Sequence, residues 1–211
     1  MVIFPLTGTG KILLLSKDIH ISMDCSNIII EGTLSVSNNV TSQTAIGVAG
    51  GSSITLYKDT TAYSSSTSPC LEAQTSSCIF LGGATFTLIS NSTTASGIVN
   101  LDRGCGLNCS IGCTLVIEAA SGGGVNAIAI SGGYALVRNL SVTGSFSAAV
   151  VGASGNSFFI VDSGATVTNN ATGKRCTGRY GAQFLVYGAG ANRLPGDAPI
   201  DVTAAQFCYY G

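Results

Sequence analysis

The hydrophobic residues of this chain recur in short runs separated by glycine, serine and asparagine. Within several runs, apolar residues alternate with small or polar ones, the period of two that is typical of a half-buried β-strand. No long stretch places apolar residues at the spacing of a helical face, so we predict almost no helix. Representative runs are Ile28–Ile30, Thr33–Val36, Ser53–Tyr57, Ile79–Leu81, Thr85–Ile89, Thr114–Glu118, Ala127–Ile130, Ala135–Arg138 and Phe158–Val161.

The turns between the runs favour a solenoid over a β-sandwich. A spacing of roughly 8–14 residues would suit either architecture. However, the sequence holds few of the Asn-Gly or Asp-Gly pairs that tight hairpins prefer. Three strands per coil of roughly 20–25 residues would stack at ~4.8 Å around aliphatic ladders. We therefore expect an all-β, right-handed parallel β-helix (β-solenoid) with a small C-terminal β cap.

Stacked coils leave open ends, which repeat proteins cover with atypical segments. The predicted organisation is an N-terminal cap or attachment segment at 1–18, a β-solenoid at 19–178 and a C-terminal cap at 179–211.

Composition suggests a protein whose surface is largely covered by other protein. Only 9% of the residues are charged and 45% are hydrophobic, against roughly 25% charged in an average soluble domain. Intrinsically disordered chains have the opposite composition, with few hydrophobic residues and a high net charge. The longest aliphatic run, Ile12–Leu15, is far shorter than the ~20 residues of a membrane-spanning helix, so we expect no membrane insertion. Obligate interfaces are apolar in the same way as a divided core.

Charge and the start of the chain exclude further classes. The net charge is −1, and no basic stripe is available to neutralise phosphates, so nucleic acid is not an expected partner. Met1–Leu6 lacks a basic start and contains Pro5, so we expect no secretion signal.

The eight cysteines and the single histidine do not form a metal motif. Cys105, Cys109 and Cys113 are four residues apart, whereas zinc sites use short paired spacings. His20 lies in an alternating stretch, where a surface strand histidine is expected rather than a catalytic base. We predict buried thiols or late-forming disulfides, with Cys70 and Cys78 as the closest hairpin-like pair.

The carboxylates and the glycine clusters suggest no reaction centre. The ten acidic residues are scattered along the chain. An enzymatic alternative requires Asp102, Glu118 and Asp162 to align on one face, since glycosidases act with paired carboxylates. The glycine clusters lack the lysine and Ser/Thr ending of a phosphate loop. We therefore expect no catalytic residue, no cofactor and no metal.

The segment from about residue 157 to 211 resembles the C-terminal ends of bacteriophage tail-spike and tail-fibre proteins. The resemblance lies in the order of its pieces. A last strand pair is followed by a Gly-Lys-Arg step, a glycine-proline corner and a closing segment rich in tyrosine. These pieces are Phe159–Val161 with Ser163–Val167, Ala171–Arg175, Gly188–Gly196 and Val202–Gly211. The sequence departs from the pattern at Gln206–Tyr209, where such chains usually have Gly-Gly-Gln-Tyr.

The resemblance implies a β-helical virion protein that is assembled in the host cytoplasm and forms a homotrimer closed by segment 179–211. As a tail spike or fibre subunit it would act in attachment or host recognition without catalysis. Its partners would be further copies of itself, other virion proteins of the tail or the major capsid protein, and host surface polysaccharide. Two alternatives stay open: a capsid decoration (cement) protein at three-fold positions of the shell, and a small polysaccharide depolymerase.

Basic and aromatic residues gather near the C-terminus and are the candidate interface. Arginine binds carboxylates in bidentate fashion, and tyrosine gives large contact area at little entropic cost. The alternatives are a solvated turn face for the cations and sugar binding for the tyrosines. The candidates are Lys174, Arg175, Arg179, Tyr180, Tyr187, Arg193, Tyr209 and Tyr210.

Overall fold

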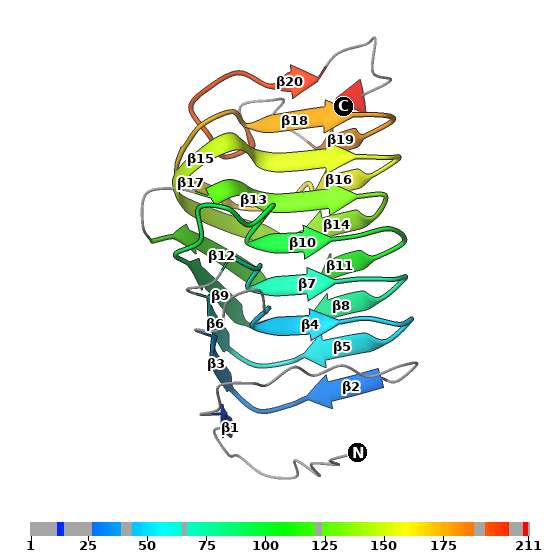
Figure 1. Cartoon of the computed structure of the whole chain (residues 1–211), viewed down its shortest axis with the longest axis vertical. Helices are drawn as coiled ribbons and strands as arrows, with labels where there is room; N and C mark the ends of the chain where they lie inside the picture. The colour runs from blue at the N-terminus through cyan, green and yellow to red at the C-terminus, as the bar shows by residue number, and fades with distance from the viewer. Residues whose placement is uncertain are drawn as a thin grey trace.

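The computed structural model describes residues 12–14, 27–38, 44–64, 67–120, 124–187, 193–202 and 209–210. In these residues the chain winds around one axis for about six turns, and every strand pairs in parallel with the strands of neighbouring turns. No α-helix occurs in these ranges. The prediction of an all-β parallel solenoid is therefore confirmed (Figure 1).

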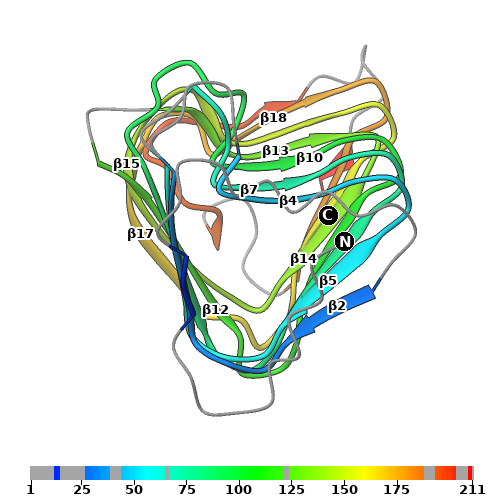
Figure 2. The same ribbon diagram turned by 60° about the horizontal axis from the view of Figure 1, so that its bottom comes forward.

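The solenoid has three faces around a roughly triangular outline (Figure 2). The A face contains β1 (Ile12–Leu14), β3 (Leu34–Asn38), β6 (Thr60–Ser64), β9 (Thr85–Ser90), β12 (Thr114–Ala119), the first part of β15 (Asn139–Ser154) and β17 (Val167–Thr172). The B face contains β2 (Asn27–Ile30), β5 (Ser53–Leu56), β8 (Cys78–Leu81), β11 (Gly106–Cys109), β14 (Tyr134–Val137), β16 (Phe158–Val161), β19 (Gln183–Val186) and β21 (Tyr209–Tyr210). The C face contains β4 (Ile46–Val48), β7 (Leu71–Ala73), β10 (Val99–Leu101), β13 (Gly124–Ser131), the second part of β15, β18 (Cys176–Arg179) and β20 (Asp201–Val202).

Strand β15 joins two of the faces. Its first part pairs with β12 and β17 on the A face, and its second part pairs with β13 and β18 on the C face. Gly144, at φ +122°, lies within this strand, and a Cβ atom there would approach Ala119 too closely. The A and C faces thus form one continuous 13-stranded sheet, while the B face is a separate 8-stranded sheet.

The coils range from lengths within the predicted range of roughly 20–25 residues to slightly longer ones. One coil takes 25 residues from Leu115 to Leu140 and 29 residues from Phe86 to Leu115. The longer coil contains the irregular segment 91–98 between β9 and β10.

Aliphatic and aromatic ladders fill the interior, because the same strand position points inward in every coil. On the B face, small and large side chains complement one another, and Ala135 pairs with Phe159 on the next coil. Burial of such columns is the main favourable contribution to folding. The buried members of this ladder are Ile54, Ile79, Leu107, Ala135, Phe159 and Phe184.

The corner between the C and B faces is a column of left-handed turn residues. The successive coils have Ser76 at φ 57°, Gly104 at φ 71°, Gly132 at φ 74° and Asn156 at φ 57° at this corner. Glycine adopts this conformation freely and asparagine tolerates it. The column is hydrogen-bonded along the axis, for example from Gly104 N to the Gly132 carbonyl at 2.8 Å. The glycine and asparagine residues between the hydrophobic runs therefore set the corners.

Strand pairing extends across both predicted domain boundaries. Strand β1 pairs with β3, and β19 pairs with β16 and with β21. The division into 1–18, 19–178 and 179–211 thus coincides with no break in the described sheets, and separate roles for the end segments stay a prediction.

Replacing an inward residue should cost far more stability than replacing its outward neighbour. Phe86 is 1% exposed in the A-face ladder between Thr60 and Leu115. We expect Phe86→Ala to lower the free energy of unfolding by about 3–5 kcal/mol because it leaves a cavity. Thr87→Ala, on the outer side of the same strand, should cost about 1 kcal/mol or less. Urea denaturation followed by circular dichroism measures both, and similar losses would contradict this interior.

Candidate functional site

The candidate interface residues lie at the last coils but on three different corners. Lys174 and Arg175 precede β18 at the corner between the A and C faces. Arg179 and Tyr180 lie at the corner between C and B, and Tyr187 follows β19 at the corner between B and A. A solenoid distributes neighbours in sequence over its perimeter, so these residues form no single patch. Tyr209 and Tyr210 form β21 of the B face, and their side chains lie outside the described residues.

Two of the cations bind the end of the chain to the column. Lys174 Nζ lies 2.8 Å from Asp201 Oδ2, and Arg175 Nη1 donates to the Ala198 carbonyl at 2.9 Å. The Asp197 carboxylate accepts a hydrogen bond from Gly173 N at 2.7 Å. These contacts connect β20 with β18, so in this chain Lys174 and Arg175 have an intramolecular role.

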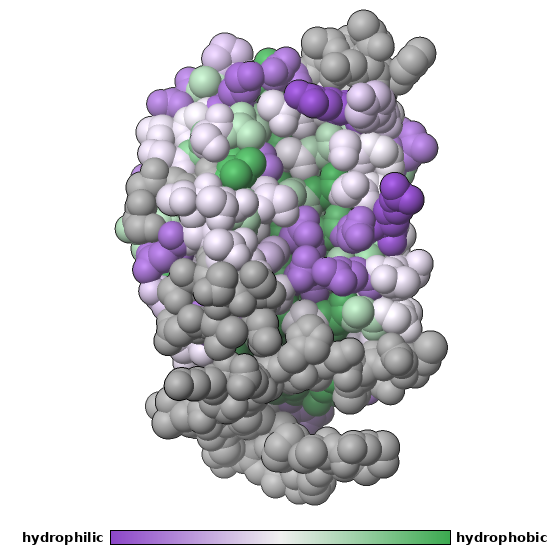
Figure 3. All heavy atoms as spheres, viewed as in Figure 1, coloured by the Kyte–Doolittle hydropathy of each residue, from purple (hydrophilic) through white to green (hydrophobic). Residues whose placement is uncertain are grey.

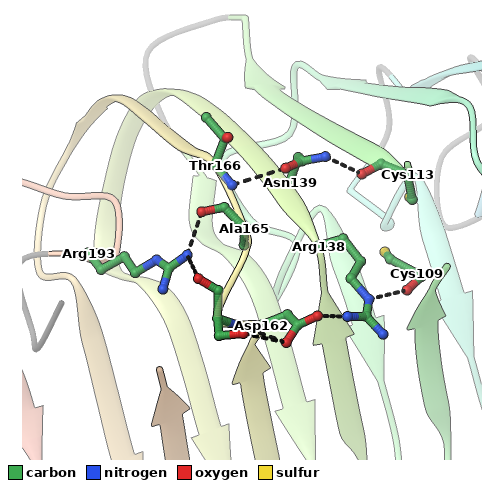
Figure 4. A network of polar contacts seen from close by, with 9 residues as sticks. Cys109, Cys113, Arg138, Asn139, Asp162, Ala165, Thr166 and Arg193 are labelled. Atoms are coloured by element: carbon green, nitrogen blue, oxygen red, sulfur yellow. Dashed lines mark hydrogen bonds and ion pairs between the residues drawn. The ribbon is translucent and has the colours of Figure 1, made fainter. Parts of the chain in front are cut away.

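Arg193 connects three backbone carbonyls at the corner between B and A, and Figure 4 shows its contact with Ala165. Its guanidinium donates to the carbonyls of Ser163 (3.2 Å), Ala165 and Tyr187. Guanidinium offers five N–H donors in a rigid plane, which suits several acceptors at once. Arg193 therefore fastens the C-terminal segment onto the preceding coil.

Toward the N-terminal coils, the same corner continues as a polar column (Figure 4). Arg138 forms an ion pair with Asp162 on the next coil, and its Nε donates to the Cys109 carbonyl at 3.4 Å on the previous one. Asn139 Nδ2 donates to the Cys113 carbonyl, and Asn139 Oδ1 accepts from Thr166 N, each at 3.0 Å. Sequence reasoning missed this column; its only signal is a recurrence of polar residues about one coil apart.

The acidic residues of the enzymatic alternative do not align. Asp102 follows β10 at the corner between C and B, Glu118 lies in β12 on the A face, and Asp162 is paired with Arg138. Glu72, which the sequence did not single out, lies on the outer side of the C face. It accepts hydrogen bonds from Thr44 Oγ1 at 2.6 Å and from Asn100 Nδ2 at 3.0 Å.

The described cysteines form no disulfide with one another. Cys70 and Cys78, the candidate pair for a late disulfide, are not bonded: Cys70 is buried and donates to the Ile89 carbonyl, whereas Cys78 lies on the outer side of β8. Burial raises the pKa of Cys70 to about 12. The Cys109 pKa is also raised, mainly by a hydrogen bond with the Cys113 thiol and then by burial. Such thiols are inert.

In the described ranges, no group of three or more His, Cys, Asp or Glu residues is arranged to hold a metal ion. His20, Cys25 and Cys208 lie outside these ranges. The described segments also contain no helix with the length and apolar character needed to cross a bilayer.

The outer side of the B face has no charged side chain from β2 to β19. We call these fourteen outward positions the B strip; it mixes exposed apolar residues with small polar ones. Phe80 and Phe158 are each 38% exposed, and Ile29 is 57% exposed. The B strip consists of Asn27, Ile29, Ser53, Thr55, Cys78, Phe80, Gly106, Asn108, Tyr134, Leu136, Phe158, Ile160, Gln183 and Leu185.

Tyr134 lies flat along the middle of the B strip. A Cβ atom on Gly106 would overlap the Tyr134 ring, so the glycine makes room for it. The Tyr134 hydroxyl interacts with Cys78, two coils away, and the Tyr134 pKa is raised, first by burial and then by this thiol. Glycine at position 106 therefore keeps this part of the surface flat.

Comparison with protein-family models, with curated proteins and with solved structures finds no match for the chain. Functional inference therefore depends on the solenoid and on the chemistry of its surfaces.

Lysine should not replace Arg193. We expect Arg193→Lys to destabilise the last coil by about 1–3 kcal/mol, because a single ammonium nitrogen cannot reach all three carbonyls, which Arg193 contacts through two separate nitrogens. Hydrogen exchange should be faster at the amides of Ala165 and Tyr187, which lie beside the acceptors. Arg179→Lys is the control, since Arg179 acts on Asp201 through its charge and lysine keeps that charge. Equal exchange rates in both variants would contradict the role of Arg193.

The ion pair between Lys174 and Asp201 should be detectable as a lowered pKa of Asp201 in a titration. The hydrogen bond and charge of Lys174 hold the pKa of Asp201 below its usual 3.8. The stabilisation is therefore present above the usual pKa and is lost as the pH falls through the lowered one. Lys174→Gln should return the Asp201 pKa toward its usual value in an NMR titration, whereas Lys58→Gln, at an exposed position on a distant coil, should leave it unchanged. High salt should weaken the shift, because the pair is half exposed.

Proposed function

We propose that this protein is a structural subunit of a bacteriophage particle, a homotrimeric β-solenoid of the spike or fibre type that acts in attachment or host recognition. The observation that supports it most directly is the B strip, a neutral and partly apolar surface that runs along the column. A contiguous and partly apolar surface of this size often marks a binding surface. A subunit of a larger assembly has such a surface covered.

The polar contacts of the described residues also favour a structural role. Carboxylates connect one coil to the next rather than meeting in one place. Asp59 Oδ1 accepts from Thr85 N at 2.9 Å, Glu72 accepts from Thr44 and Asn100, and Asp162 pairs with Arg138. Each carboxylate thus holds the register of neighbouring coils, which suits a rigid column.

The outer surface of the C face combines polar and apolar side chains rather than being mainly apolar. Figure 3 shows hydrophilic side chains beside pale and apolar ones over the strands of this face. The C-face row contains Gly47, Glu72, Asn100 and Ala129 on successive coils. In a spike, a polar face of this type would remain in solvent, where host polysaccharide is met.

A capsid decoration protein is the second candidate. The strands of the solenoid extend from Ile12 to Tyr210, so most of this chain is one column. A trimer of such columns would suit three-fold positions of a shell, where it would clamp neighbouring capsid subunits.

Copy number in purified particles tests the proposal and separates its two forms. An antibody against the recombinant chain should label phage particles in electron microscopy, and quantitative mass spectrometry should count the copies. A handful of copies per particle would indicate the tail, and hundreds would indicate the shell. Absence from purified particles would reject the proposed function.

The depolymerase alternative has its own measurement. Host capsular polysaccharide is incubated with the protein, and the release of reducing ends is followed. We expect no release above the buffer control. Release that disappears in Glu72→Gln, with the solenoid intact by circular dichroism, would instead favour an enzyme.

A further inference from the structure

We propose that the B strip is the contact between copies of this chain, which lie side by side with their solenoid axes parallel. This inference rests on the proposed function, which supplies the oligomer. It deepens that proposal by naming the surface through which the copies would associate.

Charge restricts what can cover the B strip. All fourteen outward positions are neutral, whereas the outer sides of the other faces contain Glu118 on the A face and Glu72 and Asp201 on the C face. Nucleic acids and charged peptides are recognised by complementary charge, which this surface lacks. An uncharged and partly apolar protein surface is therefore the kind of partner that fits the strip.

The dimensions of the strip suit a protein contact. Seven strands at ~4.8 Å make a strip about 29 Å long, and four residues per strand make it about 13 Å wide. The projected area of about 400 Å² lies in the range of functional patches. Exposed tyrosines at the B–A edge enlarge it, with Tyr57 49% and Tyr187 53% exposed. A standard interface buries about 800 Å² on each partner, so the strip would form the centre of the contact and the residues at its edges would supply the rest.

The periodicity of the strip favours a second copy as the occupant. Leu136, Ile160 and Leu185 follow one another on successive coils in direct register. A partner that covers them must offer apolar groups at the same coil spacing over the same length. The strip of another copy does so, because rotation about an axis parallel to the solenoid keeps equal coils level.

Flatness at the middle of the strip permits close approach. The Tyr134 ring lies over Gly106 rather than projecting outward, so Phe80 and Phe158 are the prominent groups on either side. Two such surfaces can pack with aromatic rings next to aliphatic side chains. Cys78 lies under the Tyr134 hydroxyl and would be covered by the contact, so this native thiol reports on it.

The test places a charge on the strip and compares it with the same change elsewhere. Ile160→Lys and Leu136→Lys introduce a cation on the outer side of the B face, and Ser141→Lys does so on the outer side of the A face. Molar mass is measured by light scattering after size exclusion, with circular dichroism to check folding. We expect a trimer for the wild type and for Ser141→Lys, and a mass shift to monomer for folded Ile160→Lys and Leu136→Lys.

A second measurement uses Cys78. Alkylation by iodoacetamide, followed by peptide mass spectrometry, should modify Cys78 slowly in the wild type and at least tenfold faster in Ile160→Lys. Buried Cys70 should stay unmodified in both and serves as the internal control for folding. The inference is overturned if the wild type is a monomer at micromolar concentration, or if folded strip variants keep the wild-type mass and Cys78 protection.

The two proposals fail separately. A chain that is present in phage particles but does not associate through the strip retains the function and loses the inference. A chain that associates through the strip but is absent from particles retains the inference and loses the function.

Discussion

The hydrogen-bonded register between successive coils is the constraint on which the rest of the structure depends. Each inward position lies above its counterpart one coil earlier, so one strand pattern generates both the core ladders and the outer rows. A shift of one residue would move the hydrophobic set of a strand to the outside. The side-chain bridges from Asp59 to Thr85, and from Glu72 to Thr44 and Asn100, fix this register from the outside.

The strands were predictable from the sequence, but their arrangement around the axis was only partly so. Alternation in runs such as Thr85–Ile89 identifies the strand and its buried side, because that signal is local. Coil length depends on irregular segments such as 91–98, which have no periodicity, and the expected 20–25 residues were too few for the coil that contains this segment. The cations Lys174, Arg175 and Arg193 were expected to form one patch because they are close in sequence. In a solenoid, however, residues that are close in sequence lie on different corners.

The candidate site shows the reverse case, in which residues distant in sequence form one surface. The members of the B strip come from seven strands. Each is a common residue type such as Ser, Thr, Phe or Leu, which alone does not indicate a binding surface. Their common neutrality is visible only after the register aligns them. Gly106 is the clearest example, since its role is to make room for Tyr134 one coil later. A single sequence offers no signal for such a pairing.

The continuity of β15 gives the column a mechanical asymmetry. Where one strand turns from the A face into the C face without interruption, those two sides share a single backbone ladder and resist separation together. The B side shares no backbone ladder with them and is joined to them by its corners and by the common hydrophobic core. Under load or partial unfolding, the seams beside the B sheet should therefore open before the bend at Gly144, so that the column would come apart as a wide folded ribbon and a narrow one.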